Sequence, residues 1–384
     1  MLQQAIKAAT IKDILTGRDD GAPIHFFSPT AFIDRLNEFL RGFPGDVTFA
    51  VKANPTDEVL QTLCQNGING FDVASPDEIE QIRRICPNAP MNYNNPVRSK
   101  SEIAAGIAGG VTSWSVDTVA EYQKLIQYGV AADAEIAVRI KLPVAGALYD
   151  FGAKFGANEE TAIEILKMVD AHGHQNAMTF HVGTQCTDPN AYVAYIHACA
   201  RIAEMAGVTL VRLNVGGGFP SGRDGQHRPL EPFFAAIRDA MSAFDERPVL
   251  LCEPGRGLVG DAFSYAVQVK SLRGNAVFLT DGIYGGLSEM VMFDAPACAV
   301  LGEDGLFKSG PRAPRRAFGP TCDSVDLLKS DLWLPDDVAE GDWIIFRSMG
   351  AYVTGVTTRF NGYGAFQTQV VRDIDAPYEA AGQV

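Results

Sequence analysis

The fold is indicated first by residues 47–52, VTFAVK, an apolar and β-branched run that ends on a lysine. Such a run predicts a short buried strand. Similar runs recur downstream at close to regular intervals: 70–73 GFDV, 91–95 MNYNN, 113–117 SWSVD, 136–140 IAVRI, 179–182 TFHV, 212–215 RLNV and 250–253 LLCE. Together they predict eight strands of a parallel sheet.

Helical patterns separate these strands. Residues 75–78, SPDE, form a capping box with proline at the first helical position, and Ser28-Pro29 opens a helix that Gly42 closes. Eight strand-helix units within about 220 residues match the size of a (β/α)₈ barrel, the TIM-barrel form of the α/β class. A doubly wound open sheet is the structural alternative.

A second, β-rich domain is predicted after residue 262, where helical periodicity is weak. We assign residues 27–262 to the barrel and 263–384 to this domain, with residues 1–26 joining it. Its predicted strands are 263–272 FSYAVQVKSL, 275–282 NAVFLTDG, 297–302 ACAVLG, 342–348 DWIIFRS and 351–358 AYVTGVTT.

Composition restricts the function classes. The chain has 384 residues, 47% of them apolar and 20% charged, which is typical of a folded globular protein. Its net charge of −14 opposes binding to nucleic acid and to anionic membrane surfaces. No stretch approaches the roughly 18 apolar residues of a membrane span, and the N-terminus lacks the pattern of a signal peptide.

The seven cysteines are scattered and include no C-x-x-C pair, so the sequence predicts neither a disulfide framework nor a metal site. A reducing compartment fits this pattern best. We therefore expect a cytoplasmic protein that binds neither nucleic acid nor membranes.

Reactive residue types gather at the predicted strand ends, where barrel enzymes place their chemistry. They are Lys52, Asp72, Asn95, Arg139, His181, Gly216-Gly217-Gly218 and Glu253. Lys52 follows an apolar run, which makes it a candidate for forming a Schiff base, although it could instead extend to solvent. The three glycines could form a simple turn or let backbone N–H groups approach a phosphate.

Glu253 and His181 complete a set that suits one cofactor. A carboxylate facing a pyridine nitrogen keeps that nitrogen protonated, which makes pyridoxal phosphate an electron sink. An ordinary ion pair is the simpler interpretation of Glu253, and a core imidazole that of His181. Lysine, glycine loop, carboxylate and stacking imidazole together describe a pyridoxal phosphate site.

The chain resembles the fold type III pyridoxal phosphate-dependent decarboxylases, the ornithine, diaminopimelate and arginine decarboxylase group, and within it the ornithine decarboxylases most closely. The resemblance covers nearly the whole length. It rests on AVKAN (50–54), FDVAS (71–75), KFGA (154–157), FHVGTQCTDP (180–189), GGGFP (216–220), EPGRG (253–257), DGIYGG (281–286), GPTCDS (319–324) and MGAY (349–352). It implies an alanine racemase-like barrel with a β domain.

The resemblance also implies residue roles. Lys52 would bind the cofactor covalently, His181 would stack on its ring, and Glu253 would pair with the ring nitrogen. The phosphate would be held by Gly218, Gly255, Arg256 and Tyr352, and the cofactor would be lined by Asp72 and Arg139. Cys322 would come from the partner subunit of a homodimer with shared active sites and would protonate the carbanion-like intermediate after carbon dioxide leaves.

Two acidic residues indicate which substrate the resemblance implies. Asp294 and Asp323 match the pair with which ornithine enzymes hold the distal ammonium, and Asp323 stands where diaminopimelate decarboxylases carry glutamate. Asp294 could also be an ordinary surface acid. The expected activity is conversion of L-ornithine to putrescine in polyamine biosynthesis. A dual lysine/ornithine enzyme stays open because the two substrates differ by one methylene, and arginine or diaminopimelate are lower alternatives.

Three other functions fit the sequence less well. A racemase would need a tyrosine base where GPTCDS stands, and none is there. An inactive homologue that binds partner proteins as a decoy would have lost reaction residues, whereas Lys52, His181, Glu253 and Cys322 all remain. A phosphate-binding barrel without pyridoxal chemistry would need neither Lys52 nor Cys322.

Overall fold

The computed structural model describes residues 9–142, 154–379 and 381, which form two compact units. One unit contains residues 36–220 and 229–258, and the other contains the described residues up to 35, residues 221–228 and those from 259 onward. The first eight residues of the N-terminus, on which the absence of a signal peptide was partly judged, lie outside the described residues.

The larger unit is a closed barrel of parallel strands. Closure is seen at β2, which pairs with β3 on one side and with β9 on the other. This pairing confirms the (β/α)₈ prediction and excludes the open sheet. The strands are β2 (Asp46–Ala50), β3 (Gly70–Val73), β4 (Met91–Tyr93), β5 (Ser113–Val116), β6 (Glu135–Arg139), β7 (Gln175–Thr179), β8 (Arg212–Asn214) and β9 (Val249–Cys252).

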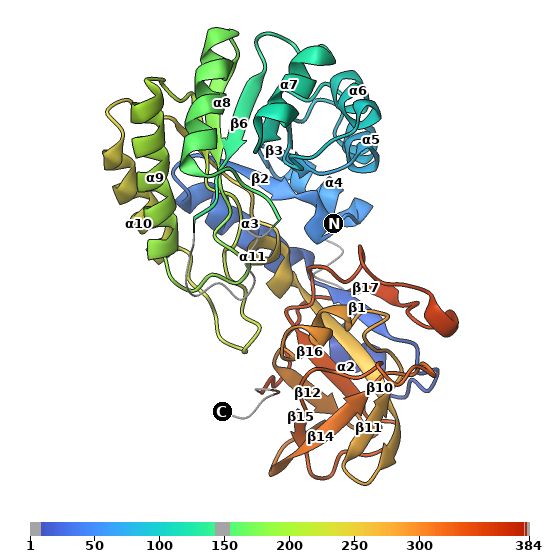
Figure 1. Cartoon of the computed structure of the whole chain (residues 1–384). Coiled ribbons are helices and arrows are strands. Elements are labelled where there is room, and N and C mark those ends of the chain that lie inside the picture. Colours follow the sequence, from blue (N-terminus) through green and yellow to red (C-terminus); the bar gives the residue numbers. More distant parts are fainter. Residues whose placement is uncertain (1–8, 143–153, 380, 382–384) are drawn as a thin grey trace. The chain divides into compact units, whose positions relative to one another are not determined.

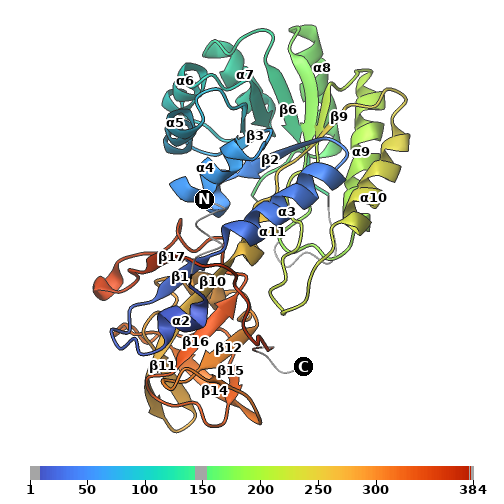
Figure 2. The same cartoon turned by 180° about the vertical axis from the view of Figure 1, so that it is seen from behind.

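Helices surround these strands (Figures 1 and 2). They are α3 (Pro29–Gly42), α4 (Asp57–Gln65), α5 (Pro76–Ile85), α6 (Lys100–Ala108), α7 (Val119–Gln127), α8 (Glu159–Ala171), α9 (Asn190–Ala206), α10 (Glu231–Ala240) and α11 (Arg256–Val259), with short 3₁₀ turns η1 (Val51–Ala53) and η3 (Met241–Ala243).

The start of α5 contains the capping box predicted at residues 75–78, but only half of it forms as expected. The Ser75 side chain accepts a hydrogen bond from the Glu78 amide, as the capping box predicts. Glu78 Oε2, however, accepts from the amide of Ala74 at 2.7 Å. The carboxylate thus fixes the chain between β3 and α5, close behind the strand that carries Asp72.

The predicted strand ends are slightly too long, and this changes where the reactive residues lie. β2 ends at Ala50, so Lys52 lies in the turn η1. His181 lies two residues beyond the end of β7, and Glu253 directly follows β9. These side chains are therefore held by short turns at the carboxyl ends of the strands, the usual place for barrel chemistry.

The second unit is built on a nine-stranded sheet with the order β13-β12-β16-β10-β11-β14-β15. The two remaining strands lie off this path, because β1 pairs with β10 and β17 pairs with β1. The pairing of β1 with β10 places residues 24–27 in this sheet. Its elements are α2 (Ile11–Leu15), β1 (Ile24–Phe27), η4 (Gly260–Ala262), β10 (Phe263–Arg273), β11 (Ala276–Leu279), η5 (Ser288–Val291), β12 (Cys298–Leu301), β13 (Phe307–Lys308), β14 (Arg312–Phe318), β15 (Leu332–Pro335), β16 (Trp343–Arg347), η6 (Phe360–Gly362) and β17 (Gln367–Val370).

One predicted strand of this unit is wrong. Residues 351–356 form turns and bends, residues 357 and 358 have no regular structure, and Tyr352 has a φ of +59°. A left-handed backbone at that position is incompatible with an extended strand. The sequence analysis also missed β14, whose arginines and Pro314 give it no apolar alternation.

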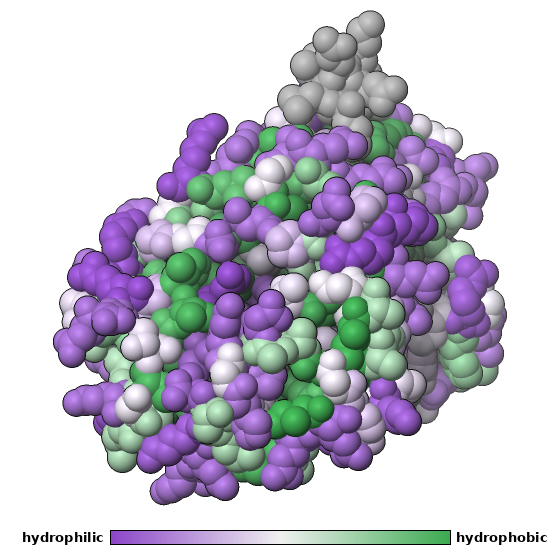
Figure 3. All heavy atoms as spheres, turned by 90° about the horizontal axis from the view of Figure 1, so that it is seen from above, coloured by the Kyte–Doolittle hydropathy of each residue, from purple (hydrophilic) through white to green (hydrophobic). Residues whose placement is uncertain are grey.

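Two surface properties follow from the described residues. No helix among them has both the length and the apolar character needed to cross a membrane. On the face shown in Figure 3, hydrophobic residues lie in small groups among hydrophilic ones.

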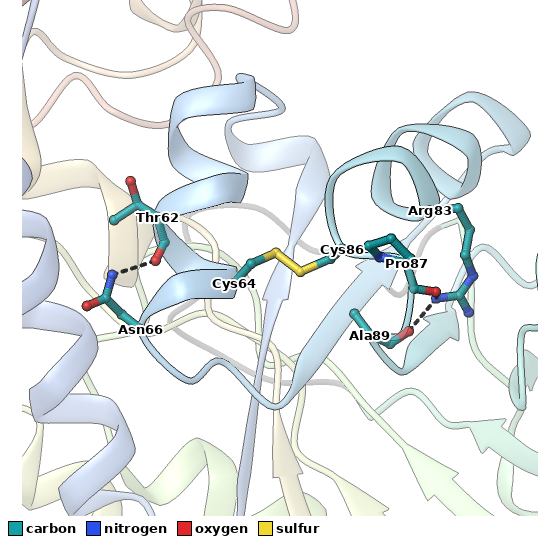
Figure 4. The surroundings of a disulfide bond; sticks show 7 residues. All are labelled: Thr62, Cys64, Asn66, Arg83, Cys86, Pro87 and Ala89. Atoms are coloured by element: carbon teal, nitrogen blue, oxygen red, sulfur yellow. Dashed lines mark hydrogen bonds between the residues drawn. A yellow bond between two sulfur atoms is a disulfide. The ribbon is translucent and has the colours of Figure 1, made fainter. Parts of the chain in front are cut away.

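A disulfide between Cys64 and Cys86 corrects the expectation drawn from the scattered cysteines. Cys64 is in the last turn of α4 and Cys86 caps α5 (Figure 4). Spacing along the chain could not show this pair, because 22 residues separate the two cysteines and the barrel brings the ends of neighbouring helices together. Arg83 supports the same corner by donating to the Ala89 carbonyl.

Candidate active site

Lys52 is held beside a buried carboxylate at the mouth of the barrel. Its Nζ lies 3.3 Å from Asp72 Oδ2, and its side chain is 50% exposed whereas that of Asp72 is only 3% exposed. The register of β2 and β3 sets Ala50 opposite Asp72, so the turn η1 carries Lys52 past the end of its strand and over its neighbour. The amine is thus both anchored and open to a reactant.

Glu253 is fixed by two amides that the sequence analysis did not single out. Asn94 Nδ2 and Asn214 Nδ2 both donate to its Oε1. Asn95, the asparagine singled out at that strand end, instead donates to the Ala74 carbonyl at 3.4 Å. The prediction was therefore wrong by one residue, because β4 ends at Tyr93 and Asn94 is the first residue beyond it.

Burial, reinforced by the nearby charge of Asp72, raises the pKa of Glu253 from 4.5 to about 8. Asn214, Lys52 and Arg139 act in the opposite direction. With this pKa the Glu253 carboxyl is mostly protonated at neutral pH in the cofactor-free protein, and a nearby cation would favour its ionised form. A basic pyridine nitrogen bound beside it could accept this proton and leave the carboxylate as its partner.

Arg139 lies near the carboxylates of Glu253 and Asp72, and His181 lies near Arg139 and Lys52. Burial, with the charges of Arg139 and Lys52, lowers the pKa of His181 to about 3, so its imidazole is neutral. Its Nδ1 accepts from the amide of Gly183 at 3.0 Å, which fixes the ring. The Arg139 guanidinium lies 5.3 Å from the ring centre of Phe155 in the KFGA stretch.

The glycines at 216–218 are required by close backbone contacts. A Cβ atom on Gly217 would lie 2.8 Å from the Glu253 carbonyl oxygen, and one on Gly218 would lie 2.4 Å from that of Gly183. Gly218 also has a φ of +99°, which side chains other than hydrogen rarely allow. The next turn contains buried Gly255 and Arg256, the latter 6% exposed.

These groups fit pyridoxal phosphate. Among the described residues, Asp72 Oδ1 is buried without a hydrogen-bond partner, which leaves an acceptor at the site. Lys52 would supply an amine, Glu253 a buried carboxyl group for the ring nitrogen, His181 a neutral flat ring, and the glycine loop a surface without side chains. The barrel unit alone thus brings together Lys52, Asp72, Arg139, His181, Gly218, Glu253, Gly255 and Arg256.

Four further residues of the predicted site belong to the second unit. Cys322 is exposed, and both its amide and its thiol donate to Asn361 Oδ1 at 3.2 Å. The neighbouring Asp323 accepts a 2.6 Å hydrogen bond from the Tyr284 hydroxyl, which lowers the pKa of this carboxyl. Asp323 is therefore ionised at neutral pH.

Asp294 and Tyr352 are placed differently. The Asp294 side chain is 70% exposed and lies 3.7 Å from the ammonium of Lys329. Tyr352 is half-buried in a left-handed turn. The supporting residues Asn94, Asn214 and Tyr284 escaped the sequence analysis. The sequence signal that could have indicated the two asparagines is their position: Asn94 directly follows β4, and Asn214 is the last residue of β8.

Comparisons with known proteins identify the family. A family model described as the pyridoxal-binding domain of pyridoxal-dependent decarboxylases matches residues 30–260. The chain therefore belongs to the pyridoxal-dependent decarboxylases of fold type III, and its cofactor is pyridoxal 5'-phosphate.

Relatives within this family have several names. The lysine/ornithine decarboxylase of Selenomonas ruminantium is 32% identical over 85% of this chain and 84% of its own length. Antizyme inhibitor 2 of Xenopus laevis is 30% identical over 85% and 75%. The solved structure of the lysine/ornithine decarboxylase from Vibrio vulnificus, complexed with putrescine, is 30% identical and superposes with a TM-score of 0.78, covering 92% of this chain and 95% of that one.

Proposed function

We propose that this protein decarboxylates a basic L-amino acid, with L-ornithine as the preferred substrate and putrescine as the product for polyamine biosynthesis. The observation that carries the substrate class is the ionised Asp323 next to Cys322, held by the Tyr284 hydroxyl at 2.6 Å. A fixed anion beside the proton donor suits a substrate with a distal ammonium group.

The roles of the barrel residues follow from their contacts. Pyridoxal phosphate, when bound, accepts the electron pair that the departing carboxylate leaves at Cα. Lys52 would bind the cofactor and give way to the substrate amine, and Asp72 would hold the Lys52 ammonium in place when no cofactor is bound. Glu253, with Oε1 fixed by two amides, offers its other oxygen to the ring nitrogen. Neutral His181 would cover the ring, Arg139 and Asp72 would line it, and the phosphate would be held by Gly218, Gly255, Arg256 and Tyr352.

Cys322 supplies the proton that replaces carbon dioxide at Cα. Its thiol hydrogen is directed to Asn361 Oδ1, so Asn361 orients the thiol before transfer. We propose that Cys322 and Asp323 serve the barrel of the partner subunit in a homodimer, with Asp294 as a second acid for the distal ammonium. Reciprocal use of one loop in two sites is what a two-fold dimer permits.

The test is a comparison of amino acids. Purified protein with pyridoxal phosphate is given L-ornithine, L-lysine, L-arginine or meso-diaminopimelate, and carbon dioxide and amine release are measured as kcat/KM. We expect ornithine to exceed lysine by up to roughly 100-fold, the discrimination that one methylene permits. Equal values would identify a dual lysine/ornithine enzyme. Release only from arginine or diaminopimelate would overturn the substrate assignment.

A second function, binding of partner proteins without catalysis, is favoured by one observation, the similarity to antizyme inhibitor 2. Against it stands the intact pairing of Lys52 with Asp72 and of Glu253 with two asparagines. A protein that binds the cofactor but releases no carbon dioxide from any of these four amino acids would support the partner-binding function.

A further inference from the structure

The first turn of α9 contacts the glycine loop through a buried tyrosine. Tyr192 is fully buried, and its hydroxyl donates to the carbonyl oxygen of Gly217 at 2.9 Å. Its ring stacks on that of Phe219 with centroids 5.1 Å apart. Burial raises the pKa of this hydroxyl well above its usual value, so it keeps its proton and acts as a donor throughout the working pH range.

The carbonyl groups of the loop are all engaged on the protein side. The Gly216 oxygen accepts from the Glu253 amide, and the Gly218 oxygen accepts from the Cys186 amide, both at 2.9 Å. Tyr192 supplies the donor for the oxygen between them. It is the side-chain donor in this set, whereas the other two are backbone amides.

Fixing a carbonyl also fixes the next amide. The C=O and N–H of one planar trans peptide point in opposite directions. The bond from Tyr192 to the Gly217 oxygen therefore directs the Gly218 N–H away from α9. Within the described part of the chain, the amides of Gly217 and Gly218 donate to no protein acceptor.

We propose that Tyr192 is a positioning residue that aims the Gly218 amide at the phosphate of the cofactor. The glycines on both sides of this peptide allow it to rotate when its carbonyl is not held. Removing the hydroxyl lets the peptide turn and weakens phosphate binding, while the groups that bind the pyridine ring are unaffected. The inference rests on the proposed placement of the phosphate at the glycine loop.

The test separates the phosphate from the ring. Cofactor-depleted Tyr192→Phe protein is titrated with pyridoxal 5'-phosphate and with pyridoxal, which lacks the phosphate, and the visible absorbance of the lysine-bound ligand gives each Kd. We expect pyridoxal phosphate to bind roughly tenfold more weakly, as for loss of one well-placed hydrogen bond, and pyridoxal to bind as in the wild type. No substrate is used, so the result is independent of the proposed decarboxylation.

Tyr122→Phe is the matched control. Tyr122 is equally buried, and its hydroxyl bonds to His174 Nδ1 at 3.0 Å, away from the loop. This variant loses the same group and should bind both ligands as the wild type does. A merely structural role for Tyr192 would weaken both ligands equally, and an unchanged Kd for pyridoxal phosphate would show no role at all; either result overturns the proposal.

If Tyr192→Phe is too unstable without cofactor to be titrated, a second measurement replaces the titration. Holoprotein of wild type and Tyr192→Phe is trapped with excess free amine, and the release rates of the two ligands are compared. Faster release of pyridoxal phosphate with unchanged release of pyridoxal supports the proposal. Equal acceleration of both ligands contradicts it.

Discussion

Lys52 and Asp72 form an ion pair of 3.3 Å in which the amine is half exposed and the carboxylate is buried. Asp72 lies in β3, and Lys52 lies in η1, two residues after the Ala50 that pairs with Asp72, so their proximity follows from the register of β2 and β3. A buried carboxylate is stabilised in its charged form by this ammonium. The pair therefore links the stability of the barrel mouth to the residue proposed to carry the cofactor.

Replacing Lys52 with alanine should abolish the visible absorbance of lysine-bound cofactor and reduce decarboxylation below detection, because no other amine replaces it at this turn. Absorbance spectra and carbon dioxide release measure both effects. Lys124→Ala is the control, since Lys124 pairs with Glu121 on α7 and should leave the spectrum unchanged. Retention of the wild-type spectrum by Lys52→Ala would disprove the assignment.

Glu253 should make the cofactor-free protein less stable as pH rises. Burial and the Asp72 charge raise the pKa of Glu253 in the folded state from 4.5 to about 8. Below about pH 4.5 Glu253 carries its proton in both the folded and the unfolded chain, so it adds nothing to the pH dependence of the free energy of unfolding. Between the two values the unfolded chain releases its proton first, so the free energy of unfolding falls as pH rises, and above about 8 the loss is complete.

The Glu253→Gln variant does not titrate at this site, so it should lack this part of the pH dependence. Its stability relative to the wild type should grow across the same window, by a few kcal/mol at most. Urea unfolding of both cofactor-free proteins at about pH 5 and about pH 8.5 measures this difference. A constant difference between the two proteins would contradict the raised pKa of Glu253.

The Cys64–Cys86 disulfide should contribute to stability. A cross-link that closes a separation of 22 residues is worth about 3 kcal/mol by the chain-entropy argument. Cys64→Ser should therefore lower the Tm by several degrees, and a reducing agent should lower the Tm of the wild type but not that of the variant. Two free thiols at these positions in the oxidised protein, detected by mass after alkylation, would refute this prediction.

Neutral replacements can separate the two acids that are proposed to bind the substrate, Asp294 and Asp323. Asp323→Asn keeps an oxygen for the Tyr284 hydroxyl but loses the charge, so KM for ornithine should rise by roughly 10 to 100-fold with an unchanged cofactor spectrum. Asp294→Asn should also raise KM if Asp294 reaches the distal ammonium. An effect at Asp323 alone would identify Asp294 as a surface acid paired with Lys329.

The sequence predicts elements and residues that depend on the local pattern of apolar residues. It does not predict contacts that form only when the elements pack together. The barrel and the positions of Lys52, His181 and Glu253 follow from apolar runs that end at reactive residues. Asn94 and Asn214 could not be assigned, because only barrel closure brings them to Glu253. For the same reason the Cys64–Cys86 pair was missed, and Tyr352 was placed in a strand because its left-handed backbone leaves no mark in the local pattern.

Mixing two inactive variants tests whether sites are shared between subunits. Lys52→Ala retains Cys322, and Cys322→Ala retains Lys52, so a mixed dimer has one site with both intact residues. After full exchange of equal amounts, half of the dimers are mixed and the activity should reach about a quarter of the wild-type value. Cys322→Ala alone should be slower than wild type by roughly 10²–10⁴-fold, as for loss of a proton donor. Activity that never exceeds the average of the two variants would mean that Cys322 serves its own barrel or none, and the shared-site proposal would then be wrong.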